Sequence, residues 1–131
     1  MKVEQLFTGC LAEMAYYIES NGEVAIVDPL RETEPYIRMS EADKAKIKYV
    51  FLTHFHADFV SGQYDLAKKT GAKIVFGPGA KTQYEIYNGK DGEEFPLGGG
   101  KLTLLHTPGH TMESASYLIT NEEGNSPYVL T

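Results

Sequence analysis

The sequence has 131 residues, 42% of them hydrophobic, which suffices for one domain with a core and leaves no length for a second. Its formal net charge of −6 argues against nucleic acid and anionic membrane surfaces as partners, because both are bound through clustered Lys and Arg. The single cysteine, Cys10, excludes an intrachain disulfide and a zinc site built from cysteines, so we expect a soluble, cytoplasmic protein.

The first part of the chain predicts a hairpin-rich sheet. Residues 3–7 and 14–20 are rich in β-branched and aromatic side chains and predict two strands. An Asn-Gly pair then predicts a hairpin into a largely buried third strand over 24–28. Residues 32–47 have helix-forming composition, and the apolar run 49–53 is typical of a strand that is buried on both faces.

The second part predicts one more helix and further strands. The helix is expected over 61–72, with Ser61 as its N-cap and Gly71 after its last turn. Residues 77–100 are rich in glycine and predict loops with short strands at most. The remaining strands are expected over 73–76, 101–107, 114–120 and 126–131. This order, with helices after the third and fourth strands, predicts a layered α/β fold with mixed sheets.

Each of the four histidines lies at or just past the end of an expected strand, where α/β folds place ligand chemistry. In an extended segment, alternate side chains point the same way, so His54, His56 and Asp58 share one face. Three potential metal ligands in one short loop, with His110 in a second loop, favour a metal site over satisfied polar loop residues.

The stretches "THFHADFVSG" and "HTPGHTMES" resemble the metallo-β-lactamase superfamily. Within it, "HADF", "GCLAEMAYYI" and "DPLRE" are similar to the persulfide dioxygenase branch, whose relatives include glyoxalase II, and the similarity covers the entire chain. The resemblance implies an αββα sandwich with the metal at one edge.

The metallohydrolase relatives carry His-x-His-x-Asp-His and hold two metals, whereas this chain has Phe59 in place of the last His. The resemblance therefore implies one Fe(II), held by His54 and His110, with His56 and Asp58 as catalytic groups that orient and hydrogen-bond its ligands. The implied reaction converts a thiol persulfide, such as glutathione persulfide, and O₂ to sulfite and thiol. The alternative is a zinc-dependent thioester hydrolase like glyoxalase II.

In the family, an aspartate that completes the ligand set follows the strand expected here over 126–131. The sequence given stops at Thr131, so residues 1–131 are expected to form a single domain that is incomplete at the C-terminus, the first half to two thirds of the family's domain. We therefore expect impaired catalysis, or a catalytically silent fragment. We also expect exposed sheet surface that favours homo-oligomers, including strand-exchanged ones.

Four further residues receive smaller predictions. Asp28 resembles a family aspartate that braces the metal loop from behind, although an ordinary turn aspartate would look the same. His106 lies within a strand pattern and is expected to be a packed or surface histidine rather than a ligand. Cys10 is expected to act as a small buried hydrophobe, and Arg31 as an ordinary surface residue.

Overall fold

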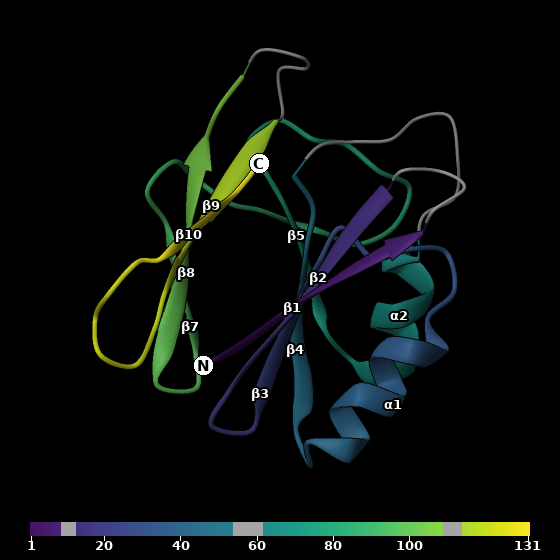
Figure 1. The fold of residues 1–131 in the computed structure, drawn as a ribbon. Coiled ribbons are helices and arrows are strands. Elements are labelled where there is room, and N and C mark those ends of the chain that lie inside the picture. The colour runs from purple at the N-terminus through teal and green to yellow at the C-terminus, as the bar shows by residue number, and fades with distance from the viewer. Residues whose placement is uncertain (9–12, 54–61, 109–113) are drawn as a thin grey trace.

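The computed structural model describes residues 1–8, 13–53, 62–108 and 114–131. Within these ranges the chain forms two β-sheets packed face to face, and two helices lie on the outer side of the first sheet (Figure 1). The helices are α1 (Glu34–Ala42) and α2 (Gln63–Thr70). The first sheet contains, in spatial order, β1 (Lys2–Thr8), β2 (Glu13–Ser20), β3 (Glu23–Val27), β4 (Lys46–Phe51), β5 (Lys73–Phe76) and β6 (Tyr87–Asn88). The second contains β10 (Tyr128–Leu130), β9 (Ala115–Thr120), β8 (Gly100–His106) and β7 (Glu94–Leu97).

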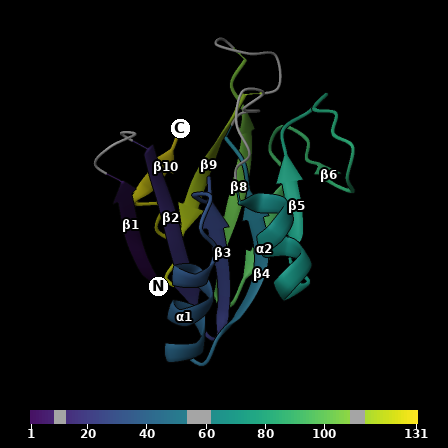
Figure 2. The same ribbon diagram turned by 90° about the vertical axis from the view of Figure 1, so that its right-hand side faces the viewer.

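The first sheet is mixed, which confirms the prediction. Strands β1, β2 and β3 pair antiparallel, and β3 to β6 run parallel. The hairpin between β2 and β3 turns at Asn21 and Gly22, whose φ angles of 47° and 85° suit a type I′ turn. The parallel crossovers carry α1 and α2, and Figure 2 shows both helices against the same face of this sheet.

Two apolar layers hold the elements together. The first lies between the sheets, where Phe51 of β4 packs against Tyr117 of β9 with ring centroids 4.8 Å apart. The second lies between the first sheet and the helices, and Tyr36 and Leu66 are the fully buried anchors of α1 and α2. The expected all-apolar strand, β4, contributes Val50 to this helix-side layer and Phe51 to the layer between the sheets, so it is buried on both faces as predicted.

Both helices are shorter than predicted. The first ends at Ala42, and Ile47, which the sequence places in the helix, instead belongs to β4 and pairs with Val24. Burial of Ile47 in the sheet outweighs the helix-forming character of the residues before it. The second begins at Gln63 with Gly62 at the N-cap position, so the prediction of Ser61 as the cap was wrong; Ser61 itself lies outside the described residues. Its predicted end is confirmed, because Gly71 adopts a left-handed conformation with φ 77°.

The layered α/β sandwich confirms the expected fold class, with one difference in the parts described. Helices cover the first sheet only, and no helix among the described residues lies on the outer face of the second sheet (Figure 1). Neither described helix has the length and apolar character needed to cross a bilayer.

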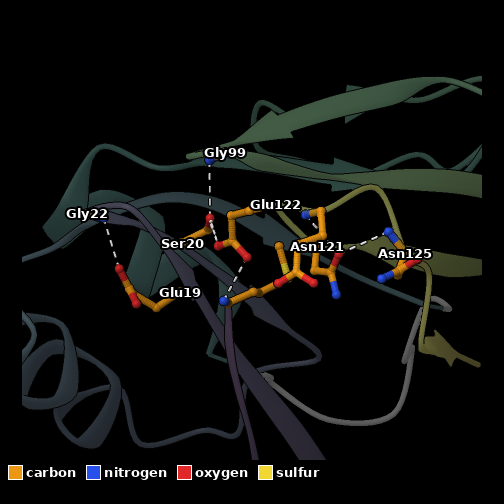
Figure 3. Close-up of polar contacts among 9 residues, drawn as sticks. Glu19, Ser20, Gly22, Gly99, Asn121, Glu122 and Asn125 are labelled. Carbon is orange, nitrogen blue, oxygen red and sulfur yellow. Dashed lines mark hydrogen bonds and ion pairs between the residues drawn. The ribbon is translucent and has the colours of Figure 1, made fainter.

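At one end of the sandwich, turns of the two sheets are tied together by a polar cluster (Figure 3). Ser20, at the end of β2, accepts a hydrogen bond from the backbone N–H of Gly99, 3.2 Å away in the turn between β7 and β8. The Ser20 hydroxyl donates to the carboxylate of Glu122, which also pairs with the amino-terminal ammonium at 2.8 Å. We call Ser20, Gly99, Glu122 and the amino terminus the turn cluster.

Candidate functional site

At the opposite end of the sandwich lie the described residues that flank the two segments with the predicted metal ligands. In the sequence, residues 54–61 follow β4 of the first sheet, and residues 109–113 fall between β8 and β9 of the second. The backbone N–H of Ala115, the first residue of β9, donates to the carbonyl oxygen of Thr53 at 2.6 Å. A hydrogen bond between the two sheets therefore brings Thr53, directly before residues 54–61, next to Ala115, which closely follows residues 109–113.

Thr53, the residue directly before His54, is held from the neighbouring strand. Asp28 follows β3, and its carboxylate accepts the backbone N–H of Thr53 at 2.9 Å and the hydroxyl of Thr53 at 2.6 Å. The backbone N–H of Asp28 donates to Phe51 at 2.8 Å, and its φ of 51° lies in the left-handed region, which Asp tolerates better than most residues. Asp28 therefore fixes Thr53, directly before residues 54–61, while the metal loop that it is predicted to brace lies outside the described residues.

Tyr117 links the sheets a second time. This β9 residue is fully buried, and its hydroxyl donates to the carbonyl oxygen of Leu52 at 2.8 Å. Burial raises the pKa of the Tyr117 phenol, and the nearby Asp28 carboxylate raises it further, so the hydroxyl keeps its proton at any ordinary pH. Tyr117 is therefore a permanent donor that holds the exit of β4 against β9.

Strands β8 and β9 stay paired up to the residues that flank 109–113. His106 pairs with Ala115, and beyond them the backbone N–H of Thr107 donates to the carbonyl of Ser114 at 3.0 Å. The side chains of Thr107 and Ser116 are also hydrogen-bonded at 3.0 Å. His106 is half-buried within β8, as expected for a packed strand histidine.

Gly62, the first described residue after 54–61, packs closely against a neighbouring segment. A Cβ atom at this position would overlap the carbonyl oxygen of Leu30, in the segment between β3 and α1. That segment is itself anchored, because the backbone N–H of Leu30 donates to the hydroxyl of Tyr36 at 2.7 Å. Residues 28–30 therefore contact the described residues on either side of 54–61, Thr53 through Asp28 and Gly62 through Leu30.

The predicted site residues His54, His56, Asp58 and His110 lie outside the described residues, as do Phe59 and Cys10. Among the side chains that the structure describes, no group of three or more His, Cys, Asp or Glu could hold a metal ion. The predicted donors suit a metal, because imidazole and carboxylate are the ligands of both zinc and non-haem iron sites. The bond from Ala115 to Thr53 supports this fit, since it brings together described residues that flank the two donor-bearing segments.

The sequence pattern does not indicate the role of three residues that fix the backbone beside these segments. It predicts only a strand position for Thr53, a helix start for Gly62 and a strand position for Tyr117. A signal existed for Thr53, because a hydroxyl directly before the first histidine can bond a carboxylate at the end of the preceding strand. Gly62 packs against Leu30 and Tyr117 bonds to Leu52. Both partners are distant in sequence, so the local pattern does not indicate these contacts. Arg31 lies exposed on the surface, as predicted.

Comparison with known proteins agrees with this architecture. The family model described as the metallo-beta-lactamase superfamily matches residues 8–122. A cytoplasmic hydroxyacylglutathione hydrolase of Arabidopsis thaliana is 33% identical over 127 residues, which are 93% of this chain and 49% of the relative. A hydroxyacylglutathione hydrolase of Salmonella typhi is 37% identical over 98 residues, 73% of this chain and 38% of the relative.

Solved structures agree as well. A metallo-beta-lactamase from Staphylococcus aureus subsp. aureus COL superposes with a TM-score of 0.85 at 33% identity, over 98% of this chain and 41% of that protein. ETHE1 from Myxococcus xanthus superposes with a TM-score of 0.82 at 28% identity, over 91% of this chain and 54% of that protein. The chain thus spans about half the length, or less, of these proteins.

Proposed function

Because the chain belongs to the metallo-β-lactamase superfamily, which is metal-dependent, we propose that its two histidine-bearing loops hold one Fe(II) for the oxidation of a thiol persulfide. The observation that carries the proposal is the hydrogen bond from Ala115 to Thr53. It joins the sheets at the point where both loops begin or end. A site that draws ligands from two sheets needs those sheets aligned, and this bond contributes to their alignment.

His54 and His110 would hold the metal, and His56 and Asp58 would orient its ligands by hydrogen bonds. When bound, Fe(II) with few protein ligands supplies open positions for O₂ and for a sulfur donor. The chain's described residues contribute rigidity. Asp28 and Tyr117 fix the backbone just before His54, so the imidazole would be presented with little loss of conformational entropy on binding.

The absence of a histidine at position 59 supports a mononuclear site. Phe59 cannot bind a metal, whereas the metallohydrolase motif has a sixth-position histidine that serves a second ion. In the proposed reaction, a persulfide RSSH, O₂ and one water give RSH, hydrogen sulfite and a proton. The S–S bond breaks, O₂ is reduced, and the outer sulfur is oxidised. Glutathione persulfide is the substrate we propose.

A second candidate is a zinc-dependent thioester hydrolase. It is favoured by the names of the Arabidopsis and Salmonella relatives, both hydroxyacylglutathione hydrolases. Both candidates act on a thiol carrier such as glutathione, and they differ in the metal and in the need for O₂. Since the chain spans about half of these relatives, a folded chain without catalysis is the third outcome to be distinguished.

The test loads the chain with Fe(II) under anaerobic conditions or with zinc, and measures metal content, O₂ uptake with glutathione persulfide, and hydrolysis of S-lactoylglutathione. We expect one iron per chain and O₂ uptake that His54→Ala or His110→Ala abolishes. Thioester hydrolysis without O₂ uptake would support the hydrolase instead. One bound metal with neither reaction would support the silent fragment.

The number of metals provides a separate test. Phe59→His restores the superfamily motif and should raise the zinc content from one ion per chain toward two. Phe55→His is the matched control, because an alternating segment turns position 55 away from His54 and His56. Two zinc ions in the unmodified chain would contradict the mononuclear proposal.

We also propose a cytoplasmic location and no nucleic-acid or membrane partner. The single cysteine and the net charge of −6 support this proposal. The name of the Arabidopsis relative includes the same compartment.

A further inference from the structure

A pocket opens at the edge of the first sheet, between α2 and the strands β5 and β6. Strand β6 pairs only with residues 75–76, the last two of β5. Lys73 and Ile74, the first two residues of β5, therefore have no partner in β6, and the pocket lies beside them. Its volume of about 620 Å³ is within the range of small-molecule sites, about 300–1,000 Å³.

The pocket lies on the far side of the molecule from the last residues of the sequence. Figure 2 shows α2, β5 and β6 on one side, and the end of the chain beside β1 and β10 on the other. The rings of Tyr87 in β6 and Phe95 in β7 are 6.0 Å apart, and β7 is the edge of the second sheet opposite β10. All residues that line the pocket lie between 64 and 87, so its walls are formed by neighbouring elements of this part of the chain.

Aromatic and apolar side chains form one part of the pocket wall. Tyr64 of α2 is 50% exposed and Tyr87 of β6 is 37% exposed, and both line the pocket. Ala72 and Ile74, which belong to the core between the first sheet and the helices, line it as well. Tyrosine rings with an exposed face stack on planar rings, so this wall suits an aromatic ligand.

Charged side chains form the other part of the wall. Lys68 lies in the last turn of α2, and the Nζ atom of Lys73 is 4.9 Å from the centre of the Tyr87 ring. None of the ion pairs between described residues includes either lysine. Glu85 is the one carboxylate among the described residues of the wall. The pocket therefore has a local excess of positive charge in a chain whose net charge is −6.

We propose that this pocket binds a nucleoside monophosphate. The base stacks on the tyrosine rings, and the phosphate accepts hydrogen bonds from the ammonium groups of Lys68 and Lys73. The Glu85 carboxylate accepts a hydrogen bond from a sugar hydroxyl or a base amine, which a simple aromatic acid does not offer.

The charge distribution favours a small anion over a long one. A nucleic-acid strand would extend beyond the pocket and meet the net negative charge of the chain, whereas a monophosphate needs only the two local lysines. The proposal concerns residues outside the candidate metal site, and it does not depend on the proposed reaction.

Titration of the ¹⁵N-labelled chain with adenosine monophosphate, followed by the amide shifts in NMR spectra, tests the site. We expect saturable shifts confined to residues 64–74 and 85–87. Adenosine, which lacks the charge, and inorganic phosphate, which lacks the ring, should each bind about tenfold more weakly or worse. Shifts centred elsewhere, or no saturation by about 10 mM, would overturn the proposal.

Two pairs of variants test the two parts of the wall. Lys73→Ala should raise the dissociation constant about fivefold or more, and Lys46→Ala is its control, because Lys46 is an exposed lysine of the same sheet outside the pocket. Tyr64→Leu should have a similar effect, and Tyr128→Leu is its control, because Tyr128 is 49% exposed and lies in β10. Unchanged amide shifts outside the pocket would show that each variant is folded. Equal dissociation constants for the pocket variants and their controls would contradict the proposal.

Discussion

Removing one hydroxyl group tests whether Tyr117 holds the two sheets together at the site. Tyr117→Phe keeps the aromatic ring that packs against Phe51, and deletes the donor to the Leu52 carbonyl. Leu52 is only 2% exposed, so water cannot readily replace the lost donor. A buried carbonyl left without a partner costs about 1–3 kcal/mol, and we expect the free energy of unfolding to fall by that amount.

Urea denaturation followed by circular dichroism measures this loss. Tyr49→Phe is the matched control, because Tyr49 lies in the same core and its hydroxyl makes no hydrogen bond to any described residue. Its loss should be clearly smaller. Hydrogen exchange gives a local measure, since the Ala115 amide that bonds Thr53 should exchange faster in Tyr117→Phe. Equal losses in the two variants, with unchanged exchange at Ala115, would refute the reasoning.

Three further substitutions test the supports of the fold and the site. Asp28→Asn keeps a residue that tolerates positive φ but removes the charge that accepts two hydrogen bonds from Thr53, and should lower the free energy of unfolding by about 1–3 kcal/mol. Gly62→Ala should destabilise the protein by about 1–3 kcal/mol, because the added methyl group overlaps the carbonyl of Leu30. The third is Glu122→Gln. The amino-terminal ammonium, together with Ser20, lowers the pKa of Glu122 from 4.5 to about 2, so its contacts stabilise the fold above pH 4.5 and are lost as the pH falls toward 2. Glu122→Gln should therefore flatten the decline in stability over this pH range.

Each of these predictions has a distinct contrary outcome. Unchanged stability of Asp28→Asn would mean that the uncharged amide serves Thr53 equally well. A tolerated Gly62→Ala would mean that the segment around Leu30 shifts freely. Parallel pH profiles for the unmodified chain and Glu122→Gln would mean that the turn cluster does not contribute to acid stability.

Local sequence patterns predicted most of the secondary structure, because strands and tight turns depend on neighbouring residues. The Asn-Gly pair identified the hairpin at Asn21, and Gly71 identified the end of α2. The predicted end of α1 was wrong for a physical reason. Residues after Ala42 have helix-forming character, but burial of Ile47 beside Val24 in the parallel sheet determines their conformation, and that burial depends on the tertiary fold.

In the candidate site, too, some features follow from local sequence and others depend on the tertiary fold. The alternation that predicts a shared face for His54, His56 and Asp58 is local and can be recognised from sequence. The brace at Asp28 could be suggested only through a family resemblance, and its bonds to Thr53 depend on two parallel strands being neighbours. The donation from Tyr117 to Leu52 crosses between sheets, so no pattern within either strand indicates it.

The hydrogen bonds between the sheets account for a property that the apolar core alone cannot provide. Apolar contacts are non-directional, so two packed sheets could slide relative to one another with little change in buried area. The bonds from Ala115 to Thr53 and from Tyr117 to Leu52 have strict distance and angle requirements, and both lie where the sheets meet the loops. They therefore fix the alignment of the sheets beside the segments that carry the proposed ligands, where an error of about 1 Å would separate those ligands. The turn cluster fixes the opposite end through Ser20 and Glu122, so the sandwich is held in register at both ends by polar contacts and stabilised between them by its core.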